Sequence, residues 1–329
     1  MSSKRDHKLD WLRVIAMTMI VLMHSPNPES NIPGYIQASM SYITAAGLVL
    51  FFMISGALLL STRLSAEEFI KKRLFKIVWP TLFWTFFYLI IYRFVIAPTS
   101  WDTLSLCIAS IPFSNQGHGV LWFMYTLAGL YLLAPILSRW LAKATKSEVE
   151  FYLLLWAITL TYPYLSLVLK IDESETGVLH YFTGYVGYFV FGYYLKCHYQ
   201  FKVWHVVLAI GFAVLIPLLL YLSGSEFDFY RMLWYLSLPV ALMAFSWYVV
   251  ICRLPLKQCK LIEKASTLSF GVYLMHIFIM RDFIWKSDVI QALPALVELL
   301  VVVIVTMLIS YFISWLISKL SFSKYIIGI

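Results

Sequence analysis

The chain has 329 residues, of which 61% are hydrophobic and only 13% are charged, and its mean hydropathy is +0.81. A soluble domain of this size needs far more charge on its surface, so the composition excludes a soluble globular protein. The net charge is +8 at neutral pH. The basic residues are distributed as in a membrane protein, so no nucleic acid partner is needed to explain this charge.

Apolar blocks of about 20 residues recur along the whole chain, and this length crosses a hydrocarbon core about 30 Å thick. We predict an all-α integral membrane protein, a bundle of about ten transmembrane helices in one polytopic domain that fills residues 1–329. The segment 103–113 could be a re-entrant piece. The predicted spans are 9–26, 38–60, 75–97, 120–138, 150–169, 179–195, 203–222, 232–252, 266–284 and 295–318.

The basic residues set the predicted orientation. Twenty of the 25 Lys and Arg precede or begin the first span or follow the second, fourth, sixth, eighth and tenth, and five lie on the other side. Cytoplasmic loops carry such an excess of Lys and Arg, so we predict that both termini are cytoplasmic. The first apolar run is not followed by a small-residue cleavage site, so we predict that it remains as a helix.

The first predicted span carries Asp10, Arg13 and His24. Arg13 and His24 return to the same helix face within about 20° and lie about 16 Å apart along the axis. Asp10 precedes Arg13 by three residues and can meet it on one face. Ionisable groups inside a membrane helix usually face the bundle interior or a wet cavity. Alternatively, Arg13 anchors the helix at the interface, and His24 is an interfacial or capping residue.

The second span and the loop after it offer a possible anion site. Ser55 is expected at a depth similar to that of Arg13, and Gly56 allows another helix or a ligand to approach closely. Arg73 and Lys76 project from one face and, with Lys72, could clamp a polyphosphate. The alternatives are ordinary small-residue packing for Ser55 and binding of anionic lipid head groups for the basic loop.

The predicted outer side holds polar and aromatic residues. His118 lies in a polar loop without Lys or Arg, and Trp122 begins an aromatic cluster just after it. Such a rim could stack on sugars, although Trp and Tyr also mark membrane interfaces in general. His276 is placed near mid-membrane, where a histidine is costly without a partner, and Tyr273 is a plausible partner three residues before it.

Signatures of soluble enzymes and of metal sites are missing from the sequence. The four cysteines show no paired spacing, and no set of Cys and His has the spacing of metal ligands. There is also no Gly-rich phosphate loop and no GxSxG motif. We therefore expect no metal.

Taken in order, seven segments resemble the acyltransferase-3 family of bacterial membrane acyltransferases. The resemblance runs from residue 8 to about 285, and the size and the lack of an attached domain resemble stand-alone members such as the enterobacterial common antigen O-acetyltransferase. The segments are Asp10-x-x-Arg13, Arg13-x10-His24, Phe51-Phe-Met-Ile-Ser55-Gly56, the basic turn before Pro80, Leu121-Trp122-Phe123, Gly184-Tyr-Val-Gly-Tyr188-Phe-Val-Phe-Gly192 and Ser269-Phe-Gly-Val-Tyr273-Leu-Met-His276.

The resemblance implies a function at the bacterial inner membrane. Members transfer an acyl group, usually acetyl from cytosolic acetyl-CoA, to a hydroxyl of an envelope glycan or lipid-linked glycan. The residues corresponding to Arg13 and His24 are required in such families, and those corresponding to Arg73 and Lys76 are taken to meet the CoA phosphates. This chain departs from the family in carrying Lys76 where Arg is common. It also has Val120 where many members have a histidine, which puts the role of His118 in doubt.

These observations give a working hypothesis for the site. Lys72, Arg73 and Lys76 hold the CoA phosphates near Ser55, and Arg13, with Asp10, steers the pantetheine arm or polarises the thioester. His24 acts as a base or briefly carries the acyl group, and Trp122, Tyr273 and His276 line the acceptor side. The alternatives are a transporter without acyl chemistry and a structural subunit of an export complex. A homo-oligomer stays possible.

Overall fold

The computed structural model describes residues 5–28, 32–62, 64–91, 121–169, 177–224 and 228–329. These residues form helices and no strand, which confirms the all-α prediction. The longer helices are α1 (His7–His24), α2 (Gly34–Leu59), α4 (Phe75–Ile90), α6 (Trp122–Leu141), α7 (Lys146–Thr159), α9 (Val186–Cys197), α10 (Val203–Leu222), α12 (Leu238–Arg253), α13 (Lys260–Ile279) and α15 (Ala295–Ile317).

Short helical segments connect or extend these helices. The π-helical turn η1 leads directly into α4, and the π-helical turn η5 directly follows α13. The other segments lie in connections or near the chain ends. They are α3 (Ala66–Phe69), η1 (Ile70–Leu74), α8 (Tyr162–Leu169), η4 (His180–Phe182), α11 (Phe229–Met232), η5 (Met280–Ile284), α14 (Asp288–Gln291) and α16 (Ser323–Ile326).

Four helices of the described chain are long and apolar enough to cross a membrane. They are α2, α10, α15 and the continuous stretch of α13 and η5, residues 260–284. α10 and α15 bury only 22% and 28% of their most apolar windows, so most of their apolar surface is left for lipid. Apolar surface on this scale is typical of a membrane protein.

Two predicted spans are interrupted. The span 150–169 becomes α7 and α8, because Pro163 lacks the N–H that a continuous helix would bond to the carbonyl of Thr159. The span 179–195 begins with the short turn η4, which is followed by Gly184 at φ 96°, and becomes α-helical at Val186. The end of the predicted span 75–97 and the segment 103–113 lie outside the described residues.

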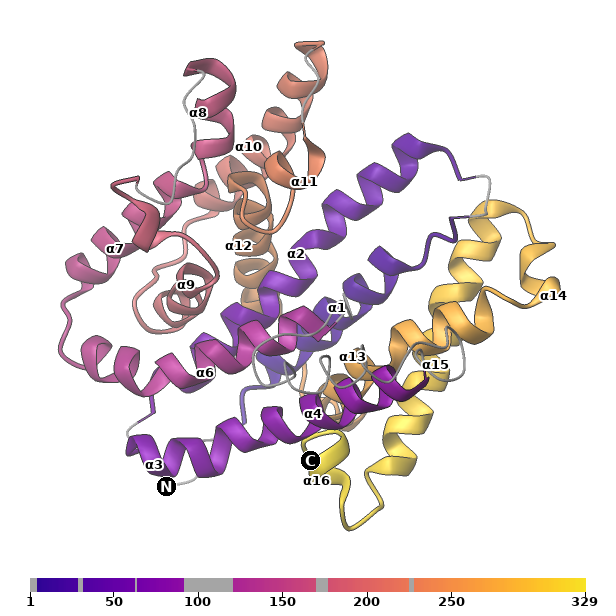
Figure 1. The fold of residues 1–329 in the computed structure, drawn as a ribbon. Coiled ribbons are helices and arrows are strands. Elements are labelled where there is room, and N and C mark those ends of the chain that lie inside the picture. The colour runs from indigo at the N-terminus through magenta and orange to yellow at the C-terminus, as the bar shows by residue number, and fades with distance from the viewer. Residues whose placement is uncertain (1–4, 29–31, 63, 92–120, 170–176, 225–227) are drawn as a thin grey trace, which may run out of the picture.

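α1 is the central helix of the bundle. It packs against α2, α12, α13 and α15, so that α7–α12 lie on one side of the α1–α2 pair and α13–α16 lie on the other (Figure 1). Leu12, Ala16, Met17, Ile20 and Val21 have no exposed surface. The helix is capped by Asp6, whose side chain accepts a hydrogen bond from the backbone of Lys8. The face of α1 that carries these residues is therefore covered by protein.

α2 and α9 approach so closely that their backbones touch. A Cβ added at Gly56 would lie 1.7 Å from the carbonyl oxygen of Phe189, and one added at Gly192 would lie 1.9 Å from that of Met53. Glycines at such crossings let membrane helices approach without a side chain between them. Gly56 in the Ser55-Gly56 pair is thus a packing residue, which is one of the two interpretations that the sequence left open.

Gly56→Ala should therefore destabilise the fold by about 1–3 kcal/mol or more, because the added methyl group overlaps backbone that cannot move aside. The expected result is a lower unfolding midpoint in detergent, measured by circular dichroism. Gly129→Ala is the matched control, since a Cβ at Gly129 meets nothing within 4 Å. An unchanged midpoint for Gly56→Ala would show that α2 and α9 do not cross this closely.

Candidate active site

An ionic cluster around the buried carboxylate of Asp10 lies at the N-terminal end of α1. Arg5 donates two hydrogen bonds to the carboxylate of Asp10, at 2.6 and 2.9 Å. The Ser266 hydroxyl donates to the same carboxylate at 2.6 Å, and Arg13 donates to the Ser266 oxygen at 3.3 Å. Asp10 is only 5% exposed. Asp10 and Arg13 are thus connected through Ser266, on the neighbouring helix α13.

Arg5, one of the basic residues that precede the first predicted span, is a member of this cluster. Its guanidinium also donates to the carbonyl of Glu263 and to the hydroxyl of Thr267, at 2.8 and 3.1 Å. The hydrogen bond to Asp10 raises the pKa of Arg5 above its ordinary value. Arg5 precedes the first helix, so helical spacing gives no signal that its side chain folds back onto Asp10.

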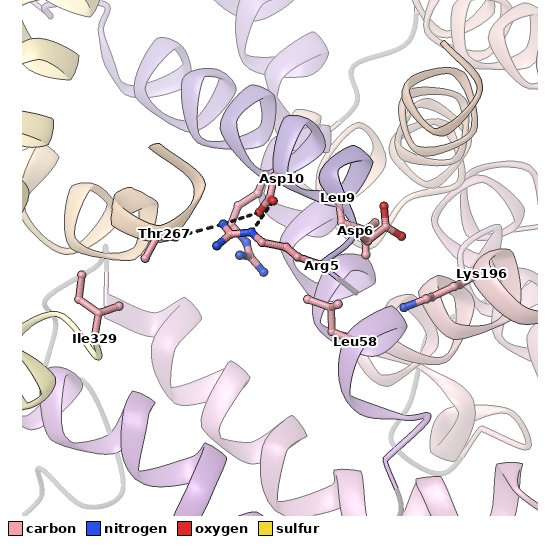
Figure 2. A pocket seen from close by; sticks show the side chains of 9 residues that line it. Arg5, Asp6, Leu9, Asp10, Leu58, Lys196, Thr267 and Ile329 are labelled. Atoms are coloured by element: carbon pink, nitrogen blue, oxygen red, sulfur yellow. Dashed lines mark hydrogen bonds and ion pairs between the residues drawn. The ribbon is translucent and has the colours of Figure 1, made fainter. Parts of the chain in front are cut away.

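The cluster forms one wall of a cavity of about 370 Å³. Figure 2 shows Arg5 reaching Asp10 and Thr267 at this cavity, with Lys196 and Ile329 on other parts of its wall. Arg13 also lines it. The described lining therefore includes three cationic side chains together with two carboxylates, Asp6 and Asp10, one of which is already bonded to Arg5. Such a cavity suits an anionic ligand.

Tyr131 on α6 connects several of the predicted donor-side residues. Its side chain lies close to Ser55 and interacts electrostatically with Arg13 and with Arg73. The expected proximity of Ser55 and Arg13 therefore arises around a tyrosine from a third helix. Tyr131 gave no signal in the sequence, because it lies in an apolar helix among many other aromatic residues.

The basic residues of η1 and α4 lie on an exposed surface. Lys72 pairs with Glu68 at 3.4 Å, and Lys71 pairs with Glu67. Arg73 and Lys76 are exposed as well. The described lining of the cavity includes none of Lys72, Arg73 and Lys76. They flank the site rather than enclose it.

Two histidines meet at the other end of α1. The ring centroids of His24 and His276 are 5.6 Å apart, although the residues come from α1 and α13. His276 has no exposed surface, and its Nδ1 lies 2.7 Å from the backbone carbonyl of Tyr273. His276 was predicted to line the acceptor side, whereas the contact between the two rings depends on the packing of α13 against α1.

The hydrogen bond of His276 fixes its tautomer. A carbonyl oxygen only accepts, so Nδ1 carries the proton, and in a neutral ring Nε2 keeps its lone pair. Nε2 is buried and has no hydrogen-bond partner among the described residues. Tyr273 was the expected partner, and it serves through its backbone carbonyl, while its ring lies beside the imidazole at 5.7 Å. His276 is thus a candidate proton acceptor.

An aromatic wall extends from the histidine pair. The ring of Tyr273 packs on Phe123 at 5.1 Å, and Trp122 packs between Tyr185 and Tyr235 at 5.4 and 5.5 Å. Tyr235 also reaches the sulfur of Met23, the residue before His24. Trp122 and Tyr273 were predicted from the sequence, whereas the positions of Tyr185 and Tyr235 depend on the fold.

Two further predictions concern His118 and metals. His118 lies outside the described residues, as does Val120. Within the described ranges, no group of three or more His, Cys, Asp or Glu side chains is placed to hold a metal ion.

The comparison with protein families assigns the chain to a class. The family described as an acyltransferase domain, acyltransferase-3, matches residues 6–315. The chain belongs to the acyltransferase-3 family. Its general class is therefore that of a membrane acyltransferase. The matched residues include both ends of α1. No curated protein and no solved structure matches the chain.

The ionic cluster gives a prediction for stability. Asp10→Ala leaves Arg5 without its carboxylate and removes the acceptor of Ser266, which should cost about 2–3 kcal/mol of unfolding free energy. The expected readout is a lower unfolding midpoint in detergent. Asp288→Ala changes an exposed carboxylate and should stay within about 0.5 kcal/mol of wild type. Equal midpoints for both variants would contradict the cluster.

Proposed function

We propose that the protein is a membrane O-acetyltransferase that moves an acetyl group from cytosolic acetyl-CoA to a hydroxyl of an envelope polysaccharide or lipid-linked glycan. One observation carries the proposal. A cationic cavity with Arg13 lies at one end of the central helix α1, and the pair formed by His24 and the buried His276 lies at the other end. Their separation along α1, about 16 Å by helix rise, is comparable to an extended pantetheine arm.

The donor enters from the side of the cationic cavity. The phosphates of CoA are anionic and require basic partners, and Arg73 and Lys76 are exposed at this end of the bundle. Lys72 adds a third charge, although it already pairs with Glu68. Arg13 then steers the pantetheine arm or polarises the thioester carbonyl, near the hydroxyl of Tyr131.

The acceptor binds at the aromatic wall. Sugar rings present apolar C–H faces that pack on aromatic side chains, and Trp122, Tyr185 and Tyr235 supply such rings in this wall. Tyr273 and Phe123 continue the wall toward His276. A glycan hydroxyl held here would be close to both imidazoles.

The chemistry needs a base and a good leaving group. His24 or His276 takes the proton of the acceptor hydroxyl as its oxygen attacks the thioester carbonyl. The carbon–sulfur bond breaks, and the CoA thiolate receives the proton, so that the products are an ester and free CoA. Alternatively, His24 carries the acetyl group briefly before the hydroxyl takes it. Holding both substrates along α1 supplies the positioning.

The proposed topology is a bundle of ten spans in the bacterial inner membrane, with both termini in the cytoplasm. The support comes from the helices found within the predicted spans and from the bias of basic residues toward one side. In this orientation Arg13 lies at the cytoplasmic end of α1, where acetyl-CoA is available, and His24 lies at the outer end.

The function is tested by mass spectrometry of envelope glycans from cells with and without the chain. We expect glycans from expressing cells, including those of the common antigen type, to gain the mass of one acetyl group. Acetyl-CoA binding by the purified protein is the second measurement, because a transporter has no use for this ligand. Glycans of equal mass, together with no binding, would rule out the proposal.

His276→Ala and His24→Ala should each lower the transfer rate by about 100-fold or more, the usual weight of a positioned base. The assay measures labelled acetyl transfer from acetyl-CoA by protein in liposomes. His180→Ala, which changes a histidine outside the pair, should keep the wild-type rate. Wild-type transfer by both variants would remove the histidines from the mechanism. Acetyl-CoA binding by each variant serves as the check that the protein is folded.

Arg73→Glu and Lys76→Glu should each weaken acetyl-CoA binding by about tenfold, because each loses a charge-assisted contact to phosphate. Isothermal titration of the purified protein measures the Kd. Lys143→Glu reverses an exposed charge in the turn after α6 and serves as the matched control. Affinities that match the control would place the CoA phosphates elsewhere.

A further inference from the structure

A second cavity, of about 270 Å³, lies between the ends of α1, α9 and α12. Its lining includes the basic residues Lys8, Lys196 and Arg253 and one carboxylate, Asp6. It shares Asp6, Leu9 and Lys196 with the cavity that contains Arg13, so the two cavities adjoin. The proposed transfer reaction uses neither Lys8 nor Arg253.

The charges of this second cavity favour an anion. Lys196 and Arg253 are exposed, and the Arg253 guanidinium lies over the ring of Phe201 at 4.9 Å. The Lys8 ammonium donates a hydrogen bond to the carbonyl of Cys252, and this bond keeps the charge of Lys8 at the cavity wall. Asp6 is occupied in part as the cap of α1. Three cations therefore face one carboxylate in the described lining.

An apolar groove of about 320 Å³ runs between α7, α9, α10 and α12. On α10 its wall includes Trp204, Leu208 and Phe212, which are 55%, 49% and 49% exposed. α10 is one of the helices long and apolar enough to cross a membrane. The groove therefore opens toward the place where lipid chains would lie.

Tyr199 joins the cationic cavity to the apolar groove. It lines the cavity, and its hydroxyl hydrogen-bonds to Nδ1 of His205 at 2.8 Å. Its ring packs edge-on against Phe245 at 5.5 Å. His205 and Phe245 both line the groove. One side chain thus lines the cationic cavity and contacts two residues of the apolar groove, an arrangement that matches a molecule with an anionic head and an apolar tail.

We propose that this composite site binds one anionic phospholipid, with its phosphate among Lys8, Lys196 and Arg253 and one acyl chain along the groove. Basic pockets at membrane helices commonly receive anionic head groups. A free phosphate compound would fill the cavity but leave the groove empty, so the groove favours a lipid. The proposal does not depend on the acyl-transfer function.

The test measures lipid retention by native mass spectrometry of the purified protein. Phosphatidylglycerol and phosphatidylcholine with identical acyl chains are the probes, and phosphatidylglycerol should be retained preferentially. Arg253→Gln should weaken its retention by about fivefold, the weight of one basic side chain near an anionic surface. Lys257→Gln, which changes an exposed lysine outside the cavity lining, should behave as wild type.

Two groove variants test the acyl chain. Ala157→Phe should fill the groove and Phe212→Ala should remove part of its wall, so both should lower phosphatidylglycerol retention. Val214→Phe changes an exposed residue of α10 outside the groove lining and should not. Phe212 is half exposed, so its variant tests the groove even if Ala157→Phe does not fold.

Three results would overturn the proposal. Equal retention of the two lipids would remove the head-group site. The groove variants could retain as much lipid as Val214→Phe, and glycerol phosphate could displace the lipid as effectively as added phosphatidylglycerol. Together these two results would indicate an anion site without a lipid chain. No retention of either lipid would exclude both parts. A loss of acetyl transfer with unchanged lipid retention would contradict the proposed function and would not contradict the lipid site.

Discussion

Burial of α1 among its neighbours is the constraint on which the rest of the structure depends. Through packing against α2, α12, α13 and α15, α1 buries Leu12, Ala16, Met17, Ile20 and Val21 completely, and it leaves Asp10 only 5% exposed. The buried carboxylate of Asp10 therefore needs polar partners, which Arg5 and Ser266 supply, and Ser266 also accepts a hydrogen bond from Arg13. The hydrogen bonds that satisfy these charges also fix α13 against α1.

The same packing brings the two histidines together. α13 lies along α1, so the contact that fixes Ser266 beside Asp10 at one end is continued at the other end by His276 beside His24. One pair of helices thereby carries both halves of the proposed reaction. Movement of α13 relative to α1 would disturb the cationic cluster and the histidine pair together, because both depend on contacts between these two helices.

The two cavities adjoin at the beginning of α1, where Asp6, Leu9 and Lys196 belong to both. An anionic lipid in one cavity and an acyl donor in the other would therefore share a wall and a cation. Such sharing provides a physical route by which the surrounding membrane could influence donor binding, since Lys196 cannot serve two anions fully at once.

The sequence by itself determined the helical class, the apolar character and the placement of Arg13 and His24 on one helix face, because hydrophobic periodicity and residue spacing are local properties. Contacts between segments that lie far apart in the sequence could not be predicted from it. The residues that join the site only through packing between segments or folding back of the chain are Arg5, Tyr131, Ser266, Tyr185 and Tyr235. The pairing of His24 with His276 likewise required the tertiary structure, because packing between helices brings the two residues together and their positions along the chain do not.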